Sequence, residues 1–143
     1  MNSAILDCNV VLQAIIGSMS AASYRTVTAC LDGDFRLVVS GEVLQEYFDV
    51  LTLPRLRSQH RFSLSQILSY LDVLVADCDR VQVTRSVSPR LTRDITDAKF
   101  LALAEVSNAN YLVTNDRRHL LPLKRHGHTR IVVPAQFLKL IRS

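Results

Sequence analysis

The stretch that decides the fold is Ser3-Ala4-Ile5-Leu6-Asp7, a short apolar run that ends in an acid. A run without polar alternation is typical of a strand buried on both faces, as in parallel α/β sheets. The run Tyr111-Leu112-Val113-Thr114-Asn115-Asp116 has the same form. Because parallel strands place their ligand sites beyond their carboxyl ends, we expect Asp7 and Asp116 to share one edge of a sheet.

Segments with helical spacing alternate with the apolar runs. Besides 3–6 and 109–114, strands are expected at 35–39, weakly at 81–83, and at 130–133. Helices are expected at 9–16, at 20–31, at 41–53 where Pro54 ends the helix, and at 134–141. A further helix is expected to begin at Ser63 or Ser65 and to bury Ile67, Leu68, Leu71 and Leu74 on one face. Another is expected to begin at Asp94 or Thr96 and to end near residue 106. This alternation predicts an α/β fold with a doubly wound parallel sheet.

The size and composition are those of one globular domain. The chain has 143 residues, a mass of 16.1 kDa and 48% hydrophobic residues, so we expect a single domain over 1–143. It lacks the run of about 18 apolar residues that a membrane span needs. Its three cysteines are odd in number and lack CxxC spacing, so we expect free thiols in a reducing cytoplasm.

The charge is unevenly distributed. The net charge is +4, and residues 117–143 contain no Asp or Glu. Two clusters of arginines flank the acids: Arg117 and Arg118 follow Asp116, and Arg85, Arg90 and Arg93 precede Asp97. Basic flanks of this kind suit a polyanion such as RNA, although a solvated basic face is the ordinary alternative.

Four acids stand in or beside apolar stretches, and as a set they predict a metal site. They are Asp7, Glu46, Asp97 and Asp116. Two carboxylates about 5 Å apart repel by roughly 3 kcal/mol at an effective dielectric of 20, so a cluster of four needs protons or a cation. Hard oxygen ligands select Mg²⁺ or Mn²⁺, ions that promote phosphodiester cleavage.

Each acid also has an ordinary structural explanation. Asp7 and Asp116 could cap the helices that follow them, Asp97 would be favoured in any first helical turn, and Asp94 reads as an N-cap. Glu46 alone would carry no signal. The four histidines have no metal-ligand spacing and are expected on the surface or in loops: His60, His119, His126 and His128. The sequence contains neither GxxxxGK[ST] nor GxGxxG, which argues against P-loop and dinucleotide-binding folds.

Several segments, in order along nearly the whole chain, resemble PIN-domain ribonucleases. The opening Leu6-Asp7-Cys8-Asn9 looks like the family's first acid followed two positions later by Asn or Ser. Residues 38–47 resemble its second strand and the helix that carries its Glu, and residues 94–104 its third acidic element. Residues 109–116 resemble its fourth strand and final acid, and residues 132–138 its usual ending. The match is greatest to the bacterial and archaeal group described as toxins of toxin–antitoxin pairs, the VapC-like proteins.

The resemblance implies a three-layer α/β/α sandwich with a central parallel sheet of four to five strands. It implies an endoribonuclease that cleaves single-stranded RNA with Mg²⁺ or Mn²⁺ held by Asp7, Glu46, Asp97 and Asp116. Asn9 and Thr114 would be polar support in the site, and Asp94 matches an acid that is often present. The expected partners are RNA and a cognate antitoxin protein, and a homodimer is left open.

Two alternatives come from other classes. A receiver- or phosphatase-like Mg²⁺ domain also places Asp at strand ends, but it predicts a DxDx[TV] motif, and Asp7-Cys8-Asn9 lacks the second Asp. A noncatalytic module that binds nucleic acid or protein would be indicated by loss of one of the four acids, and all four are present.

Overall fold

The computed structural model describes residues 1–17, 21–84 and 95–142. Its strands form one sheet in the order β3-β2-β1-β4-β6-β5. The strands are β1 (Ser3–Leu6), β2 (Arg36–Val39), β3 (Asp79–Arg80), β4 (Tyr111–Val113), β5 (Arg125–His126) and β6 (Thr129–Val132). All neighbours pair in parallel except β5 with β6. The predicted α/β fold with a mainly parallel sheet is confirmed.

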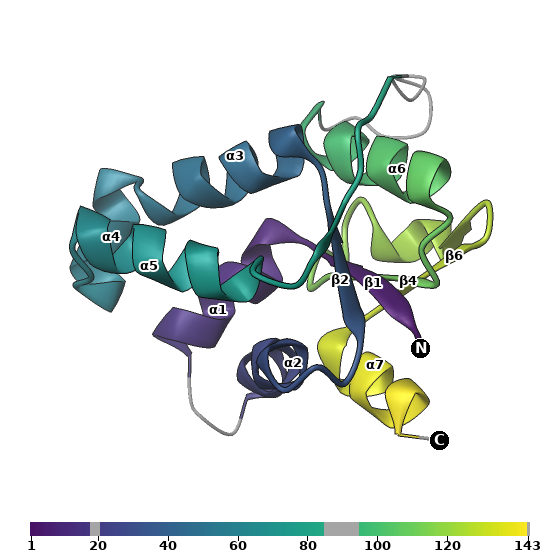
Figure 1. The fold of residues 1–143 in the computed structure, drawn as a ribbon, viewed down its shortest axis with the longest axis horizontal. Helices are drawn as coiled ribbons and strands as arrows, with labels where there is room; N and C mark the ends of the chain where they lie inside the picture. Colours follow the sequence, from purple (N-terminus) through teal and green to yellow (C-terminus); the bar gives the residue numbers. More distant parts are fainter. Residues whose placement is uncertain (18–20, 85–94, 143) are drawn as a thin grey trace.

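Helices cover both faces of this sheet. They are α1 (Cys8–Ile16), α2 (Ala22–Leu31), α3 (Gly41–Leu51), α4 (Pro54–His60), α5 (Leu64–Leu74), α6 (Ile95–Ser107) and α7 (Pro134–Ile141), with a 3₁₀ turn η1 at Leu121–Leu123. Helices α3 and α6 lie on one side of the strands and α2 and α7 on the other, so the fold has three layers (Figure 1).

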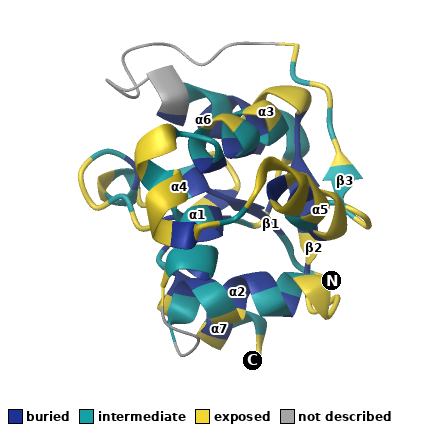
Figure 2. Ribbon diagram, turned by 90° about the vertical axis from the view of Figure 1, so that its left-hand side faces the viewer, coloured by how far each residue is buried: buried dark blue, intermediate teal, exposed yellow. Residues whose placement is uncertain are grey.

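The core is built from the apolar runs and from aromatic contacts on each face. Ala4, Ile5 and Leu6 of β1 are fully buried, as expected for a central strand with helices on both faces. On one face the ring of Phe137 packs edge-on against Phe35 at 4.9 Å. Buried positions face the middle of the molecule in every layer (Figure 2).

Helix α6 is buried on most of its sides, which fits its uninterrupted apolar sequence. Residues 100–104 are all buried. A helix that is apolar around most of its circumference belongs in the interior of a protein. Its N-terminal turn, which carries Asp97, is therefore held firmly against the rest of the fold.

The register of the central strands sets the level of the candidate acids. Leu6 pairs with Val113, and Val113 pairs with Val132. The backbone N–H of Asp7 donates to the carbonyl of Val113 at 2.9 Å. Asp7 and Thr114 are therefore the first residues beyond the carboxyl ends of two adjacent parallel strands.

Five of the six strands pair in parallel, as predicted for a central parallel sheet of four to five strands, and β5 adds an antiparallel edge. Two predictions about single elements were wrong. Pro54 does not simply end a helix: it begins α4, where proline suits the first turn because its missing N–H would have no partner there. The weak strand expected at 81–83 lies instead at Asp79–Arg80, beside β2.

Other boundaries differ by smaller amounts. Helix α5 is capped by Ser63, not Ser65, through a capping box with Gln66. Leu68 of this helix is 45% exposed and does not belong to its buried face. Helix α6 begins at Ile95, so Thr96 lies inside it, and the alternative cap Asp94 lies outside the described residues. None of the helices in the described ranges has the length and apolar character needed to cross a membrane.

Candidate acidic site

Hydrogen bonds from the backbone and the side chain fix Asp7 at the end of β1. Its backbone N–H reaches β4, its Oδ1 accepts from the N–H of Cys8 at 2.8 Å, and its Oδ2 accepts from Oγ1 of Thr114 at 2.6 Å. The side chain is only 5% exposed. Asp7 therefore both caps the N-terminus of α1 and lies at the carboxyl end of β1, in the candidate site.

Thr114 connects Asp7 to Asp116. The hydroxyl of Thr114 donates to Asp7 and accepts from the backbone N–H of Asp116 at 2.9 Å. The carboxylate Oδ1 of Asp116 in turn accepts from the N–H groups of Arg118 and His119, both at 3.0 Å. The side chain of Asp116 caps the turn that follows β4, in line with the capping role that was its ordinary explanation. Its backbone N–H is linked to the side chain of Asp7 through the hydroxyl of Thr114.

Asn9 also supports this edge of the sheet. Its Oδ1 accepts from the backbone N–H of Asn115 at 3.1 Å. The amide Nδ2 of Asn115 donates to Ser23 of α2 at 3.1 Å. The loop after β4 is therefore held by α1 and α2 on one side and by Thr114 on the other.

Glu46 approaches from α3 and is paired with a lysine. Its Oε2 lies 2.8 Å from Nζ of Lys99 on α6, and the Glu46 side chain is 14% exposed. The neighbouring Tyr47 donates its hydroxyl to the carbonyl of Leu6, which anchors α3 to the end of β1. The hydrogen bond that Lys99 donates to Glu46 raises the pKa of the lysine above its ordinary value, so the amine is charged at neutral pH.

Asp97 comes from the first turn of α6 and is 5% exposed. A helix N-terminus favours a negative charge, so part of the burial cost of this carboxylate is offset locally. Asp97 stands two residues before Lys99 on the same helix. The turn of α6 that carries Asp97 is thus linked to α3 by the Glu46–Lys99 ion pair.

The Cys8 thiol indicates that these groups share one electrostatic environment. Burial raises the pKa of Cys8 far above its ordinary range, and the charges of Asp7 and Glu46 raise it further, while Lys99 acts in the opposite sense. Cys8 therefore remains a thiol, and all three cysteines are free as predicted. Asp7, Glu46 and Lys99 thus converge from three elements on the start of α1.

The carboxylates are the type of ligand that a hard divalent cation prefers, but the acids do not form a complete coordination shell. The donors are carboxylate oxygens, two of them on nearly buried side chains, and the ammonium of Lys99 already stands as a cation against Glu46. Within 1–17, 21–84 and 95–142, no three His, Cys, Asp or Glu side chains are grouped so that they could hold a metal ion. Mg²⁺ is usually held by one or two carboxylates together with waters and substrate phosphates, so such a cage is not required.

The basic residues are only partly described. Arg117 and Arg118 are exposed beside the half-buried Asp116, as a surface that meets RNA would require. Asp94, Arg85, Arg90 and Arg93 lie outside the described residues.

His60 corrects the prediction that every histidine is a surface or loop residue. It ends α4, is 7% exposed, and its two ring nitrogens contact the backbone of Leu51 and Phe62 at 3.0 Å. His126, expected in a turn, lies in β5 with its Nε2 3.5 Å from Glu105.

The sequence analysis missed Lys99. It lies within residues 94–104, for which only the acids were predicted to have a role. Its importance comes from contact with a residue 53 positions away, on another helix. The only local signal is a lysine inside an otherwise apolar stretch, where a charged group needs a partner.

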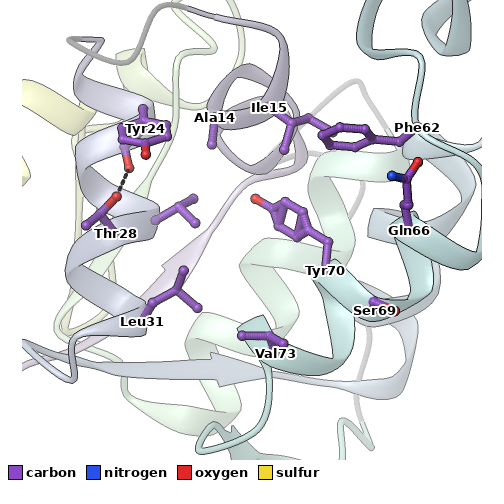
Figure 3. Close-up of a pocket in the computed structure, with 11 residues that line it drawn as sticks. Ala14, Ile15, Tyr24, Thr28, Leu31, Phe62, Gln66, Ser69, Tyr70 and Val73 are labelled. Carbon is purple, nitrogen blue, oxygen red and sulfur yellow. Dashed lines mark hydrogen bonds between the residues drawn. The ribbon is translucent and has the colours of Figure 1, made fainter.

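A second, apolar pocket lies away from the acids, between α1, α2 and α5 (Figure 3). Its volume is about 480 Å³, and it is lined largely by aliphatic and aromatic side chains. Leu31 and Val73 at its edge are 51% and 62% exposed. A smaller pocket that contains Arg57 and Arg61 shares the lining residues Phe62 and Gln66 with it.

Comparison with known proteins identifies similar chains. A family model described as PIN domain matches residues 3–118. A solved structure with the same fold is the crystal structure of VapBC2 from Rickettsia felis bound to a DNA fragment from their promoter, at a TM-score of 0.57 and 17% identity, covering 90% of this chain and 96% of that one. No curated protein matches the chain significantly.

Proposed function

This chain belongs to the PIN-domain family, and we propose that it is a metal-dependent endoribonuclease that cleaves single-stranded RNA as the toxin of a toxin–antitoxin pair. Members of the family are generally nucleases. The observation that carries the proposal is the hydrogen-bonded chain Asp116–Thr114–Asp7 at the ends of two central strands, while Glu46 and the nearly buried Asp97 come from two helices that cover one face of the sheet. The family match favours this function over a receiver- or phosphatase-like domain.

The roles follow from the positions of the side chains. The four acids Asp7, Glu46, Asp97 and Asp116 would form the site for Mg²⁺ or Mn²⁺. Such an ion, when bound, supplies positive charge to phosphate oxygens and acidifies water. The hydroxyl of Thr114 orients Asp7 by occupying its Oδ2, a task that outer partners of metal ligands commonly perform.

The exposed basic residues complete the proposed substrate path. Arg117 and Arg118 follow Asp116 directly, so a phosphate backbone that they bind lies next to the acids. Arg85, Arg90 and Arg93 remain candidates for the same path on the basis of their sequence positions alone.

The direct test is cleavage of a labelled single-stranded RNA by the purified chain with Mg²⁺, with Mn²⁺ and with EDTA. We expect cleavage with either ion, none with EDTA, and none by Asp7→Asn. Asp32→Asn, which removes the same charge from an exposed position after α2, is the matched control and should cleave normally. RNA left intact by the native chain in both ions would favour the noncatalytic module. If duplex RNA were cleaved as fast as single-stranded RNA, only the proposed preference for single strands would be wrong.

The partner is proposed on a separate observation, the apolar pocket of Figure 3. One structure with the same fold is a VapBC2 complex, and the apolar pocket here adjoins the smaller pocket that Arg57 and Arg61 line. A segment of an antitoxin could place apolar side chains in the apolar pocket and an acidic side chain against Arg57 and Arg61.

The pocket can be tested with two matched substitutions. Val73→Asp at its edge should abolish binding of the protein encoded by the adjacent gene, whereas Leu68→Asp on the same helix, outside the lining, should not. If Val73→Asp instead converts a dimer into a monomer, the pocket is covered by a second copy of the chain. Binding unaffected by Val73→Asp would place the partner elsewhere.

A further inference from the structure

Two of the three cysteines line one cavity at the amino ends of β2 and β3, the opposite edge of the sheet from the acids. Cys30 lies in the last turn of α2, and Cys78 directly precedes β3. Both are free and half-buried, and they line a cavity of about 290 Å³. Met1, which also lines this cavity, is 84% exposed, so the cavity reaches the surface. A small molecule in solution can therefore approach both thiols.

The end of α5 brings the two cysteines together. The thiol of Cys30 donates to the carbonyl oxygen of Leu74, the last residue of α5, at 3.9 Å. The backbone N–H of Cys78 donates to the carbonyl oxygen of Val75 at 3.2 Å, so the chain turns back toward the helix end. Carbonyl groups of two successive residues thus contact both cysteines, which are far apart in the sequence.

The electrostatic environment of the thiols agrees with this proximity. Burial, and to a smaller extent Cys78, raise the pKa of the Cys30 thiol to about 11. Burial also raises the pKa of Cys78, while the charge of Arg80 acts in the opposite sense. Both groups are therefore protonated at neutral pH, and Arg80 makes Cys78 the better source of an attacking thiolate.

We propose that Cys30 and Cys78 are a reversible thiol pair that forms an internal disulfide by exchange with a small-molecule disulfide. The thiolate of Cys78 attacks one sulfur of that molecule, and half of the molecule leaves as a thiolate that takes up a proton. Cys30 then loses its proton, attacks the Cys78 sulfur and displaces the other half as a second thiol. Two protein thiols are oxidised to one disulfide, and the small disulfide is reduced to two thiols.

The new bond joins two walls of the apolar pocket. Leu31 follows Cys30 in the chain, and Val73 precedes Leu74. Leu31 and Val73 line both the apolar pocket of Figure 3 and the cavity of the cysteines. The disulfide therefore fixes α2 against the end of α5, and oxidation limits how far the two helices can part at this edge of the pocket.

The test equilibrates the purified full chain with glutathione at increasing ratios of its oxidised to its reduced form. Free thiols are then blocked with N-ethylmaleimide in urea and counted by mass spectrometry. The fully reduced chain should carry three maleimides, and the oxidised chain one maleimide and no glutathione. A tryptic map should show residues 30 and 78 linked. Three maleimides at every ratio, a stable glutathione adduct on the native chain, a link through Cys8 or a link between two chains would overturn the proposal.

Three matched variants sharpen the count. Cys30→Ser and Cys78→Ser each remove one partner, so neither should form an internal disulfide. Cys8→Ser, at the start of α1, should still form it and should then carry no maleimide. An internal disulfide in Cys30→Ser or Cys78→Ser would overturn the proposal. The peptide map of the native chain gives its answer without any substitution, so a variant that fails to fold does not decide the test.

The thiol count uses neither RNA nor an antitoxin, so it can fail independently of the proposed function. A chain that forms the disulfide but does not cut RNA would refute the ribonuclease and support the thiol pair. A chain that cuts RNA and keeps three free thiols at every glutathione ratio would refute the thiol pair alone.

Discussion

The two halves of the acidic site are built differently. On the strand side, Asp7, Thr114 and Asp116 are joined to one another and to the backbone by short hydrogen bonds. On the helix side, Glu46 and Lys99 are joined by side chains alone, from two helices. The strand half is therefore fixed by the sheet. The position of Glu46 and Lys99 depends on how α3 packs against α6, so the helix half can rearrange more readily.

The largest expected effect comes from breaking the strand half at Asp7. Asp7→Asn keeps an oxygen that can accept from Cys8, but its NH2 group cannot accept the hydroxyl proton of Thr114, so unfolding should become easier by about 1–3 kcal/mol. RNA cleavage should fall by more than about 100-fold, since loss of an outer partner of a ligand alone costs about 10–100-fold. Full activity in folded Asp7→Asn would remove this residue from the mechanism.

A smaller loss is expected from Thr114→Val, which breaks the link between the two aspartates. The Oδ2 of Asp7 and the N–H of Asp116 both lose a partner, so unfolding should become easier by about 1–3 kcal/mol. Cleavage should fall by about 10–100-fold. Thr114→Ser keeps the hydroxyl and should retain most of both properties, as measured by urea unfolding and by cleavage rates. A loss in Thr114→Ser as large as that in Thr114→Val would mean that retaining the hydroxyl is not sufficient to preserve stability and cleavage.

The acids and Lys99 differ in how far the sequence could predict them. Asp7 and Asp116 were placed correctly because a continuous apolar run implies a buried parallel strand, and its end implies the ligand edge. Lys99 could not be paired with Glu46 because that contact depends on the packing of α3 against α6. The same limit applies to His60, which is buried by contacts with Leu51 and Phe62 that its turn-rich surroundings do not suggest.

The short edge strands were misplaced (β3) or missed (β5) for a different reason. Strands β3 and β5 have two residues each, too few for an alternating or continuous apolar pattern. The β5–β6 hairpin turns at Gly127, which has a positive φ of 59° that glycine adopts readily. Such strands form because a neighbouring strand offers an open edge, and that is a property of the assembled sheet.

The exposed arginines next to the strand half should show a moderate effect. Replacing Arg117 and Arg118 with Ala should weaken RNA binding and reduce the slope of log K against log salt by roughly 1.4, for two phosphate contacts on a single strand. The salt titration is the measurement, and Mn²⁺ binding by the same variant is the control that should not change. An unchanged slope would assign both residues to a solvated face.

The smallest effect is the pH dependence of the helix half. Because the folded-state pKa of Lys99 is raised by Glu46, its contribution to stability is fully present below its ordinary value of 10.5 and is lost as pH rises through the raised value. The lysine is partly exposed, so Lys99→Met should cost less than about 1 kcal/mol. The free-energy difference between native chain and variant should therefore vanish at strongly alkaline pH in urea unfolding. A constant difference up to that pH would show that the pair contributes nothing through its charge.

The most direct test of the account is whether both halves hold the same ion. A ligand that binds only the folded protein stabilises it by RT ln(1 + [L]/Kd), which is about 2.7 kcal/mol at 100 times Kd. Millimolar Mn²⁺ should raise the melting temperature of the native chain, and the rise should be reduced in both Asp7→Asn and Asp97→Asn. A rise that is lost in Asp7→Asn but intact in Asp97→Asn, or intact in both, would contradict a single site shared by the strands and helices.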